Sequence, residues 1–137
     1  MIRLSNLADY AVVAMVRLAE ADSRMSAAAL AEATGIPAPT AAKLTVLLTR
    51  AGLLDATRGA AGGVSLARTA QDVRLTDIIE AVDGPIGLTQ CLHEGAEDCA
   101  IHSTCSVKPH WQTINRTVRS ALSDVKLSDL IQVKEPA

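Results

Sequence analysis

Apolar residues recur every three or four positions through much of the first fifty residues, which is the period of an amphipathic helix. In the first such stretch they are Leu7, Ala11, Ala14, Met15 and Leu18. The pattern predicts three helices, over residues 5–20, 27–34 and 40–51. Ser5 and Ser26 are expected to cap the first two helices and Gly35 to end the second, because these residue types suit the free backbone groups at helix ends.

A short β-hairpin is expected directly after the third helix. Residues 53–57 and 64–67 favour strands, and they flank the glycine-rich stretch RGAAGG at residues 58–63. Two short helices joined by a turn at Gly35 and followed by a hairpin with Arg58 at its tip predict a winged helix-turn-helix. Each part alone is common in small proteins, and only their order favours DNA binding.

Three more segments with helical patterns follow the hairpin, over residues 75–82, 106–122 and 127–131. The second carries an apolar stripe made of Trp111, Ile114, Val118, Ala121 and Leu122. One small domain offers this stripe little to cover, so we expect it to form the seam of a homodimer. The predicted fold is mainly α: a winged helix-turn-helix with a two-stranded wing and a long C-terminal dimerisation helix.

The composition supports helix packing and a second subunit. Aromatic residues make up 1% of the 137 residues, phenylalanine is absent, and alanine, leucine and valine dominate. Small side chains favour close helix–helix contacts but bury little area each, so part of the apolar surface is expected to be covered by a second copy of the chain.

Other classes of protein are disfavoured. No apolar run is long enough for a membrane span, and Asp9 interrupts the apolar stretch at the N-terminus, which argues against a signal peptide. We therefore expect a cytoplasmic protein with reduced thiols and no membrane partner. The chain has no C-x-x-C, no glycine-rich nucleotide loop and no paired carboxylates, so an enzyme is not expected. Thiol chemistry would have to use Cys99 with His102, or Cys91 with His93.

The charge is unevenly distributed, and this permits DNA binding. The net charge is −2, but residues 1–75 carry eight Lys or Arg against six acids, whereas residues 76–137 carry five against nine. A basic first half can meet phosphates while the acidic second half faces elsewhere.

Candidate DNA contacts follow from the predicted helix-turn-helix and wing. They are Ser26, Thr40, Lys43, Arg50, Arg58 and Gly59. Thr40 and Lys43 would enter the major groove, where lysine reaches guanine acceptors or phosphates. Arg58 would reach a minor groove or a flanking phosphate. Ser26 and the amides after it suit a phosphate, although a plain helix cap explains Ser26 equally well.

Three cysteines stand close together, Cys91, Cys99 and Cys105, with the spacing C-x7-C-x5-C on a polar, aperiodic segment. An odd cluster of thiols on a polar loop favours a metal or cluster site with a fourth ligand of another kind. Structural zinc fits poorly, because its cysteines usually stand two to four residues apart. Thiols that respond to oxidation remain an alternative.

The chain resembles a known family through several segments in a fixed order. These are LSNLADYAV, RGAAGGVSLAR, LTDIIEAVDGPI, the three cysteines, and WQTINRTVRSAL followed by LSDLI. They resemble the iron–sulfur-sensing winged-helix transcription regulators of the IscR, NsrR and RirA type over almost the whole chain. The last segments look most like the branch that regulates the SUF iron–sulfur assembly operon.

The resemblance implies a homodimer on a palindromic double-stranded operator, with one Fe–S cluster (2Fe-2S or 4Fe-4S) held in each subunit by the three cysteines. In some members a histidine after the third cysteine completes the site, but the equivalent position here is Lys108, and the nearest histidine is His110. In others the ligand is an aspartate of the other subunit's first helix, which Asp9 matches. Asp9 is equally explained as a first-turn carboxylate. The remaining rivals are His93, His102 and His110, although loop histidines are usually only solvated.

These features lead to one functional expectation and one alternative. We expect a repressor of iron–sulfur assembly or iron- and redox-response genes, with a DNA-binding domain over residues 1–83, a cluster-binding loop over 84–105, and a dimerisation helix with a tail over 106–137. The alternative is a cluster-independent winged-helix regulator that senses thiol oxidation or another ligand.

Overall fold

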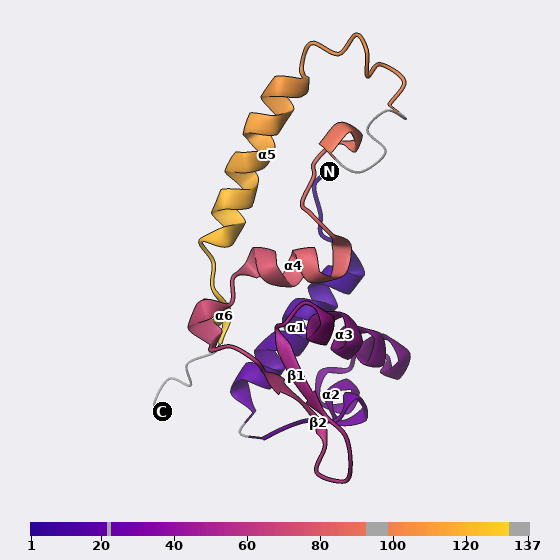
Figure 1. The fold of residues 1–137 in the computed structure, drawn as a ribbon, viewed down its shortest axis with the longest axis vertical. Helices are drawn as coiled ribbons and strands as arrows, with labels where there is room; N and C mark the ends of the chain where they lie inside the picture. Colours follow the sequence, from indigo (N-terminus) through magenta and orange to yellow (C-terminus); the bar gives the residue numbers. More distant parts are fainter. Residues whose placement is uncertain (22, 93–98, 132–137) are drawn as a thin grey trace.

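The computed structural model describes residues 1–21, 23–92 and 99–131. Its helices are α1 (Asn6–Glu20), α2 (Ala27–Thr34), α3 (Ala38–Arg50), α4 (Leu75–Asp83), α5 (Lys108–Ser123) and α6 (Leu127–Leu130). The strands are β1 (Leu54–Thr57) and β2 (Gly63–Leu66), and 3-10 turns occur at η1 (Ala70–Asp72) and η2 (Gln90–Leu92). Helices α1 to α3 and the hairpin gather at one end, and α5 rises away from them as an arm (Figure 1). The mainly α winged fold predicted from the sequence is confirmed.

The predicted caps set the ends of the first two helices. The Oγ of Ser5 accepts a hydrogen bond from the Ala8 amide at 3.0 Å, and the Oγ of Ser26 accepts one from the Ala29 amide at 3.0 Å. Gly35 ends α2 in the left-handed conformation. Helix α3 begins two residues earlier than expected, with Pro37 as its N-cap residue, because prolines are well tolerated at the start of a helix.

The core is built around the alanine-rich face of α1. Ala8, Ala11, Ala14 and Met15 are fully buried there, and the larger core side chains are Leu30, Leu44, Leu48, Leu53 and Ile78. Alanine has almost no side chain beyond its Cβ, so the neighbouring helices approach α1 closely. The core therefore forms without aromatic residues.

The chain returns to this core after α5. Leu127, the first residue of α6, is fully buried in it. The amide of Leu127 donates to the Val73 carbonyl at 2.8 Å, and the amide of Leu75 donates to the Val125 carbonyl at 2.9 Å. Both bonds hold the chain just after α5, so the C-terminal end of the arm is fixed to the segment that begins α4 and to α6.

The wing is an antiparallel hairpin tied to the turn before α2. Strands β1 and β2 pair from Leu54 opposite Leu66 to Thr57 opposite Gly63. The amide of Met25 donates to the Val64 carbonyl at 3.0 Å, and the amide of Val64 donates to the Met25 carbonyl at 2.8 Å. This isolated bridge fixes the wing relative to the helix-turn-helix.

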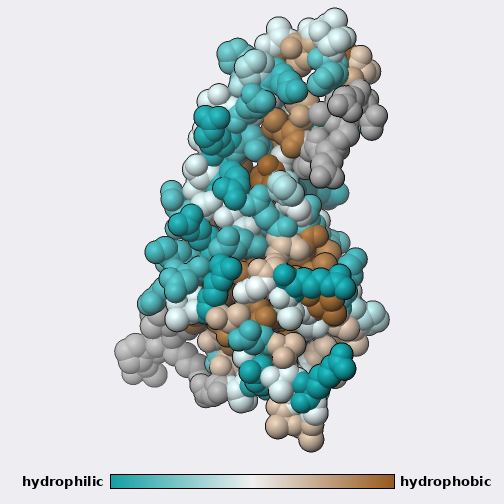
Figure 2. All heavy atoms as spheres, viewed as in Figure 1, coloured by the Kyte–Doolittle hydropathy of each residue, from teal (hydrophilic) through white to brown (hydrophobic). Residues whose placement is uncertain are grey.

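Helix α5 has no buried residue within the chain. Polar residues cover the outer edge of the arm in Figure 2, and hydrophobic surface lies between the arm and the segment beside it. Val118 and Leu122 line a cavity of about 470 Å³ together with Ile2, Leu4 and Ile79, and Ile114 stays 43% exposed. In the described ranges no helix combines the length and apolarity needed to cross a membrane.

Replacing Gly63 by alanine is expected to destabilise the protein more than the same change at Gly35. Gly35 has φ 80° and open space where a Cβ would stand. Gly35→Ala should therefore lower the free energy of unfolding only by the strain of a left-handed alanine, about 1–2 kcal/mol. Gly63 has φ 137°, and a Cβ there would stand 2.5 Å from the Met25 carbonyl oxygen. In Gly63→Ala the wing must also shift to relieve this contact, so the free energy of unfolding should fall by about 3 kcal/mol in total. Urea unfolding measures both variants, and equal midpoints would contradict this account.

Candidate functional site

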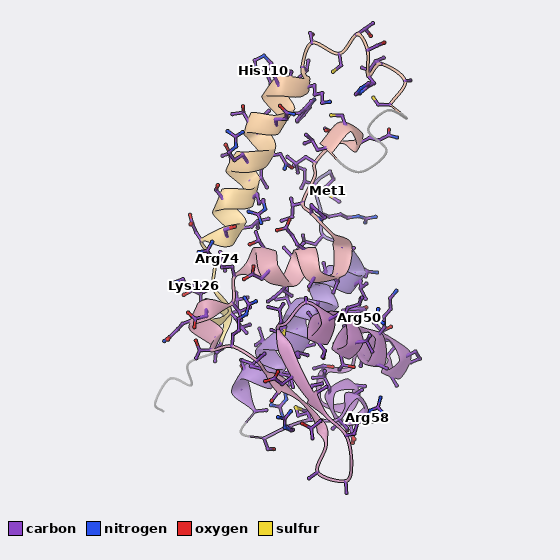
Figure 3. The ribbon with its side chains drawn as sticks, in the orientation of Figure 1. Met1, Arg50, Arg58, Arg74, His110 and Lys126 are labelled. Atoms are coloured by element: carbon purple, nitrogen blue, oxygen red, sulfur yellow. The ribbon has the colours of Figure 1, made fainter. Side chains whose placement is uncertain are left out.

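The candidate DNA-binding side chains lie on α3 and the wing. Lys43, Arg50, Arg58 and Gly59 are exposed, and Thr40 is half-buried at the start of α3. Figure 3 labels Arg50 at the end of α3 and Arg58 on the wing. Among the described residues the recorded ion pair lies elsewhere, between Arg119 and Glu80. The cations of this face therefore remain available to an anionic partner.

Two further residues shape this face. The hydroxyl of Ser26 is occupied as an acceptor by the Ala29 amide, which leaves its own proton free to donate. The guanidinium Nη1 of Arg24 donates to the Asp55 carbonyl at 3.1 Å and so joins the segment before α2 to the wing. Arg24 is absent from the sequence candidates, because nothing in its neighbourhood distinguishes it from a solvated cation.

The three cysteines line one cavity of about 120 Å³. Cys91 lies in η2, and Cys99 and Cys105 lie in the turns that lead to α5. All three are half-buried and free. The other lining residues are Thr89, Gln90, Ile101, His102, Lys108 and Trp111. The fold thus brings together thiols that stand up to fourteen positions apart in the sequence.

Polar contacts organise the wall of this cavity. The hydroxyl of Thr89 and the Sγ of Cys91 are 3.0 Å apart and share a hydrogen bond. The amide of His102 donates to the Cys99 carbonyl at 3.0 Å, which closes a turn between them. The Nδ1 of His102 is buried and has no hydrogen-bond partner among the described residues. Lys108, the first residue of α5, also lines the cavity.

Of the predicted fourth ligands, Asp9 and His110 lie outside the cavity, whereas His102 lines it. Asp9 is exposed on α1, and His110 is exposed at the start of α5, where Figure 3 labels it. Neither lines the cavity within this chain. His93 falls outside the described residues. No three Cys, His, Asp or Glu side chains in the described part of the chain are arranged to hold a single metal ion.

This donor set suits a cluster better than one ion. Thiolates are the usual ligands of iron–sulfur clusters, and a cluster offers several irons at which separate ligands can attach. Three thiols and an unpaired imidazole nitrogen around one cavity fit that requirement, whereas one tetrahedral ion would need all donors to converge on a point.

The segment leading from α4 to the cavity is fixed by two side chains. The amide group of Asn115 on α5 donates from Nδ2 to the Ile86 carbonyl at 2.9 Å and accepts from the Leu88 amide at 3.0 Å. The Oε2 of Glu80 on α4 accepts from the Ile86 amide at 2.9 Å. Arg119, one turn after Asn115, donates to the other oxygen of Glu80 from Nε at 3.2 Å and from Nη2.

These contacts form a clamp, which we define as Glu80, Asn115 and Arg119 around residues 86–88. The sequence patterns do not predict it. The sequence feature that could have indicated the clamp is Asn115, because asparagine is a poor helix former and a position in the middle of a helix suggests a role for its side chain.

The clamp is electrostatically favourable. Partial burial raises the pKa of Glu80, but the hydrogen bonds from Arg119 and the Ile86 amide outweigh it and hold the pKa below its ordinary value of 4.5. The same hydrogen bond to Glu80 raises the pKa of Arg119. Both partners are therefore charged at neutral pH.

The fold and its exposed cations define a winged-helix DNA-binding protein. The chain belongs to the Rrf2 family, described as iron-dependent transcriptional regulators, whose family model matches residues 4–133. It is accordingly a transcriptional regulator of the Rrf2 and IscR type and not an enzyme.

Individual relatives support this assignment. The HTH-type transcriptional regulator IscR of Vibrio atlanticus is 31% identical over 135 residues, which cover 97% of this chain and 77% of that protein. IscR of Cereibacter sphaeroides is 33% identical over 138 residues, and the match covers 95% of this chain and 87% of that protein. The solved structure of T. potens IscR gives a TM-score of 0.71 at 27% sequence identity, and the match covers 94% of this chain and 85% of that one. The structure of CymR, the global cysteine regulator of B. subtilis, gives a TM-score of 0.72 at 26% sequence identity, and the match covers 95% of this chain and 96% of that one.

Substituting Glu80 by glutamine is expected to cost about 1 kcal/mol or less at neutral pH, because the ion pair is partly exposed. The folded-state pKa of Glu80 is lowered, so its contribution is present above the ordinary value of 4.5 and is lost as the pH falls through the folded pKa. The stability difference between the wild type and Glu80→Gln should therefore shrink in acid.

Urea unfolding at a series of pH values in low salt measures this difference. Glu32→Gln is the matched control, since Glu32 is exposed on α2 and has no recorded ion pair among the described residues. A difference for Glu80→Gln that stays constant from neutral to acid pH would rule out the ion pair as its cause.

Proposed function

We propose that this regulator is a repressor whose operator affinity is set by an Fe–S cluster held by Cys91, Cys99 and Cys105. The observation that carries the proposal is the single cavity that all three thiols line. The family's description as iron-dependent regulators supports iron as the element sensed. The genes of iron–sulfur assembly, or of the iron and redox response, are the proposed targets on the basis of the sequence resemblance.

DNA recognition would use both halves of the winged helix. Thr40, Lys43 and Arg50 on α3 would meet the major groove and its phosphates, and Arg58 with Gly59 in the wing would reach the flanking minor groove. The free proton of Ser26 would donate to a phosphate. The bridge between Met25 and Val64 keeps the two surfaces in a fixed relation.

A homodimer is part of the proposal. The apolar stripe of α5 is not buried within the chain, Ile114 is 43% exposed, and Ile2 is 79% exposed beside the same arm. A second copy would cover this surface. Two wings related by twofold symmetry would then read a palindromic operator.

Control of DNA binding requires that the cluster favour one arrangement of the dimer over another. When bound, the cluster supplies an iron centre that is sensitive to iron supply and oxidants. The chain's own residues do the rest: Thr89 orients the Sγ of Cys91, and the clamp holds the segment beside Cys91 against α4 and α5. A change in the cavity would thereby reach the DNA-binding unit.

A second candidate is a thiol sensor that needs no cluster. It is favoured by the similarity to CymR, of which an oxidized form from Staphylococcus aureus has a TM-score of 0.72 at 25% identity. Three free, half-buried thiols around one cavity would also allow oxidation to a disulfide or a sulfenic acid.

Lys43→Ala and Arg58→Ala are expected to weaken binding to an operator selected from a random duplex pool. Each cation that contacts a phosphate releases a counterion, so its loss should lower the slope of log K against log salt by about 1. Fluorescence anisotropy over a range of salt concentrations measures the slope. Lys126→Ala is the control, because Lys126 is exposed before α6, away from the wing (Figure 3). An unchanged slope for Arg58→Ala would exclude its phosphate contact.

Anaerobic reconstitution with iron and sulfide is expected to give a brown protein with quenched Trp111 emission. Trp111 is the only tryptophan and lines the cavity, so the absorbing cluster would lie next to it. Replacing any of the three cysteines by serine should abolish both signals, whereas Ser106→Ala, outside the cavity lining, should keep them. Iron and sulfide counts, absorption and fluorescence provide the readout.

Two results would decide against the cluster. Colourless protein with stoichiometric zinc would replace it by a zinc site. Loss of thiols on peroxide titration of metal-free protein, together with a changed operator affinity, would favour the thiol sensor.

A further inference from the structure

We propose that His102 is the fourth ligand of the cysteine cavity, supplied by the same loop and the same subunit, through its Nδ1. The proposal rests on the Fe–S function proposed above and names the residue that completes the site. It selects His102 from the candidates that the sequence offers, which are Asp9 of a second subunit and its rivals His93, His102 and His110.

The backbone of the loop places His102 among the thiols. The amide of His102 bonds to the Cys99 carbonyl at 3.0 Å, and the amide of Thr104 bonds to the Ile101 carbonyl at 3.0 Å. Both are bonds between residues three apart, and in such turns side chains at that spacing fall on the same side. Cys99, His102 and Cys105 are spaced by three, and all of them line the cavity.

The spacing continues beyond the third cysteine. Lys108 and Trp111 follow at the same interval and line the cavity as well. The repeat therefore makes one continuous wall, in which His102 stands between two thiols. Cys91, which shares a hydrogen bond with Thr89, contributes the third thiol from η2.

The state of the imidazole points to an absent ligand. A histidine on a polar loop is usually solvated, but the Nδ1 of His102 is buried and finds no donor or acceptor among the described residues. Buried polar atoms without partners are rare, because their desolvation is uncompensated. His102 lines the thiol cavity, and an iron bound there would satisfy the Nδ1 lone pair while Nε2 keeps the ring proton.

The other candidates have no such feature. His110 is exposed at the start of α5, outside the cavity lining, and Asp9 is exposed on α1. Asp9 would require a second subunit to reach the site. Lys108 also lines the cavity, but its ammonium carries no lone pair and cannot ligate iron.

The test uses anaerobically reconstituted full-length protein and compares His102→Ala, His102→Cys, His110→Ala and Asp9→Ala with the wild type. Pulsed EPR of the reduced cluster reports ¹⁴N coupling from a ligating imidazole, and the decay of the visible absorption under a chelator reports cluster retention. Both readouts are independent of DNA binding.

We expect strong ¹⁴N coupling in the wild type and in His110→Ala and Asp9→Ala. His102→Ala should lose it and release the cluster at least about tenfold faster, since even supporting residues of metal sites change affinity by that factor. His102→Cys should restore retention without the coupling, because a thiolate can ligate iron in its place. A merely structural role of His102 would not produce this separation.

The outcomes also separate this inference from the proposed function. If the wild type holds a cluster but shows no ¹⁴N coupling, or if the coupling survives in His102→Ala, then His102 is not the ligand and the cluster function stands. If Asp9→Ala alone changes the spectrum and retention, the ligand comes from the first helix and the inference is wrong. If the wild type holds no cluster, both the inference and the proposed function fail.

Discussion

The close approach of α2, α3 and α4 to the alanine face of α1 is the constraint on which the rest of the structure depends. Ala8, Ala11 and Ala14 are fully buried there, and Ala11 and Ala14 belong to the same core cluster as the leucines of α2 and α3 and Ile78 of α4. Larger residues at these positions would push the neighbouring helices outward and change the orientation of α3, which carries the candidate DNA-binding residues. The fully buried core contains no aromatic side chain, which is consistent with this tight helix packing, and α5 contributes no buried residue to it.

Exclusion of α5 from the core gives the molecule two parts with few connections. One part carries the candidate DNA-binding residues, and the other contains the cysteine cavity. Tight packing of α1 against α4 fixes Glu80 in the first part, and the ion pair with Arg119 joins it to the arm. Asn115 then binds the backbone at residues 86–88, just before the cavity. The clamp is a small polar structure between a rigid core and a solvent-exposed helix, so its geometry is the natural place for a change in the cavity to be passed on.

Local features of the structure could be predicted from the sequence, and contacts between distant residues could not. Ser5, Ser26 and Gly35 act through backbone groups a few residues away, so their type and position already determine the caps. The sequence pattern puts the start of α3 two residues late, because Pro37 and Pro39 suit the N-cap and the first turn as well as a preceding loop. The bonds of Asn115 join residues nearly thirty positions apart, and no local pattern encodes them. The spacing of three residues between His102 and both Cys99 and Cys105 is visible in the sequence. It indicates that these side chains share one side of the loop only when the backbone is known to form tight turns.

The origin of the fourth ligand decides how a cluster could act on DNA. A ligand from the partner would tie the cavity of one subunit to α1 of the other, and loss of the cluster would act directly on the arrangement of the two wings. With His102 as the ligand, the cavity closes within residues 89–111 of one chain. Loss of the cluster then breaks no bond between the subunits. One route for its effect runs along residues 86–88 to Asn115 and Glu80, which join the loop to the arm and to α4. A ligand can shift an equilibrium only through contacts that differ between the two states, and under this arrangement the clamp is where they differ.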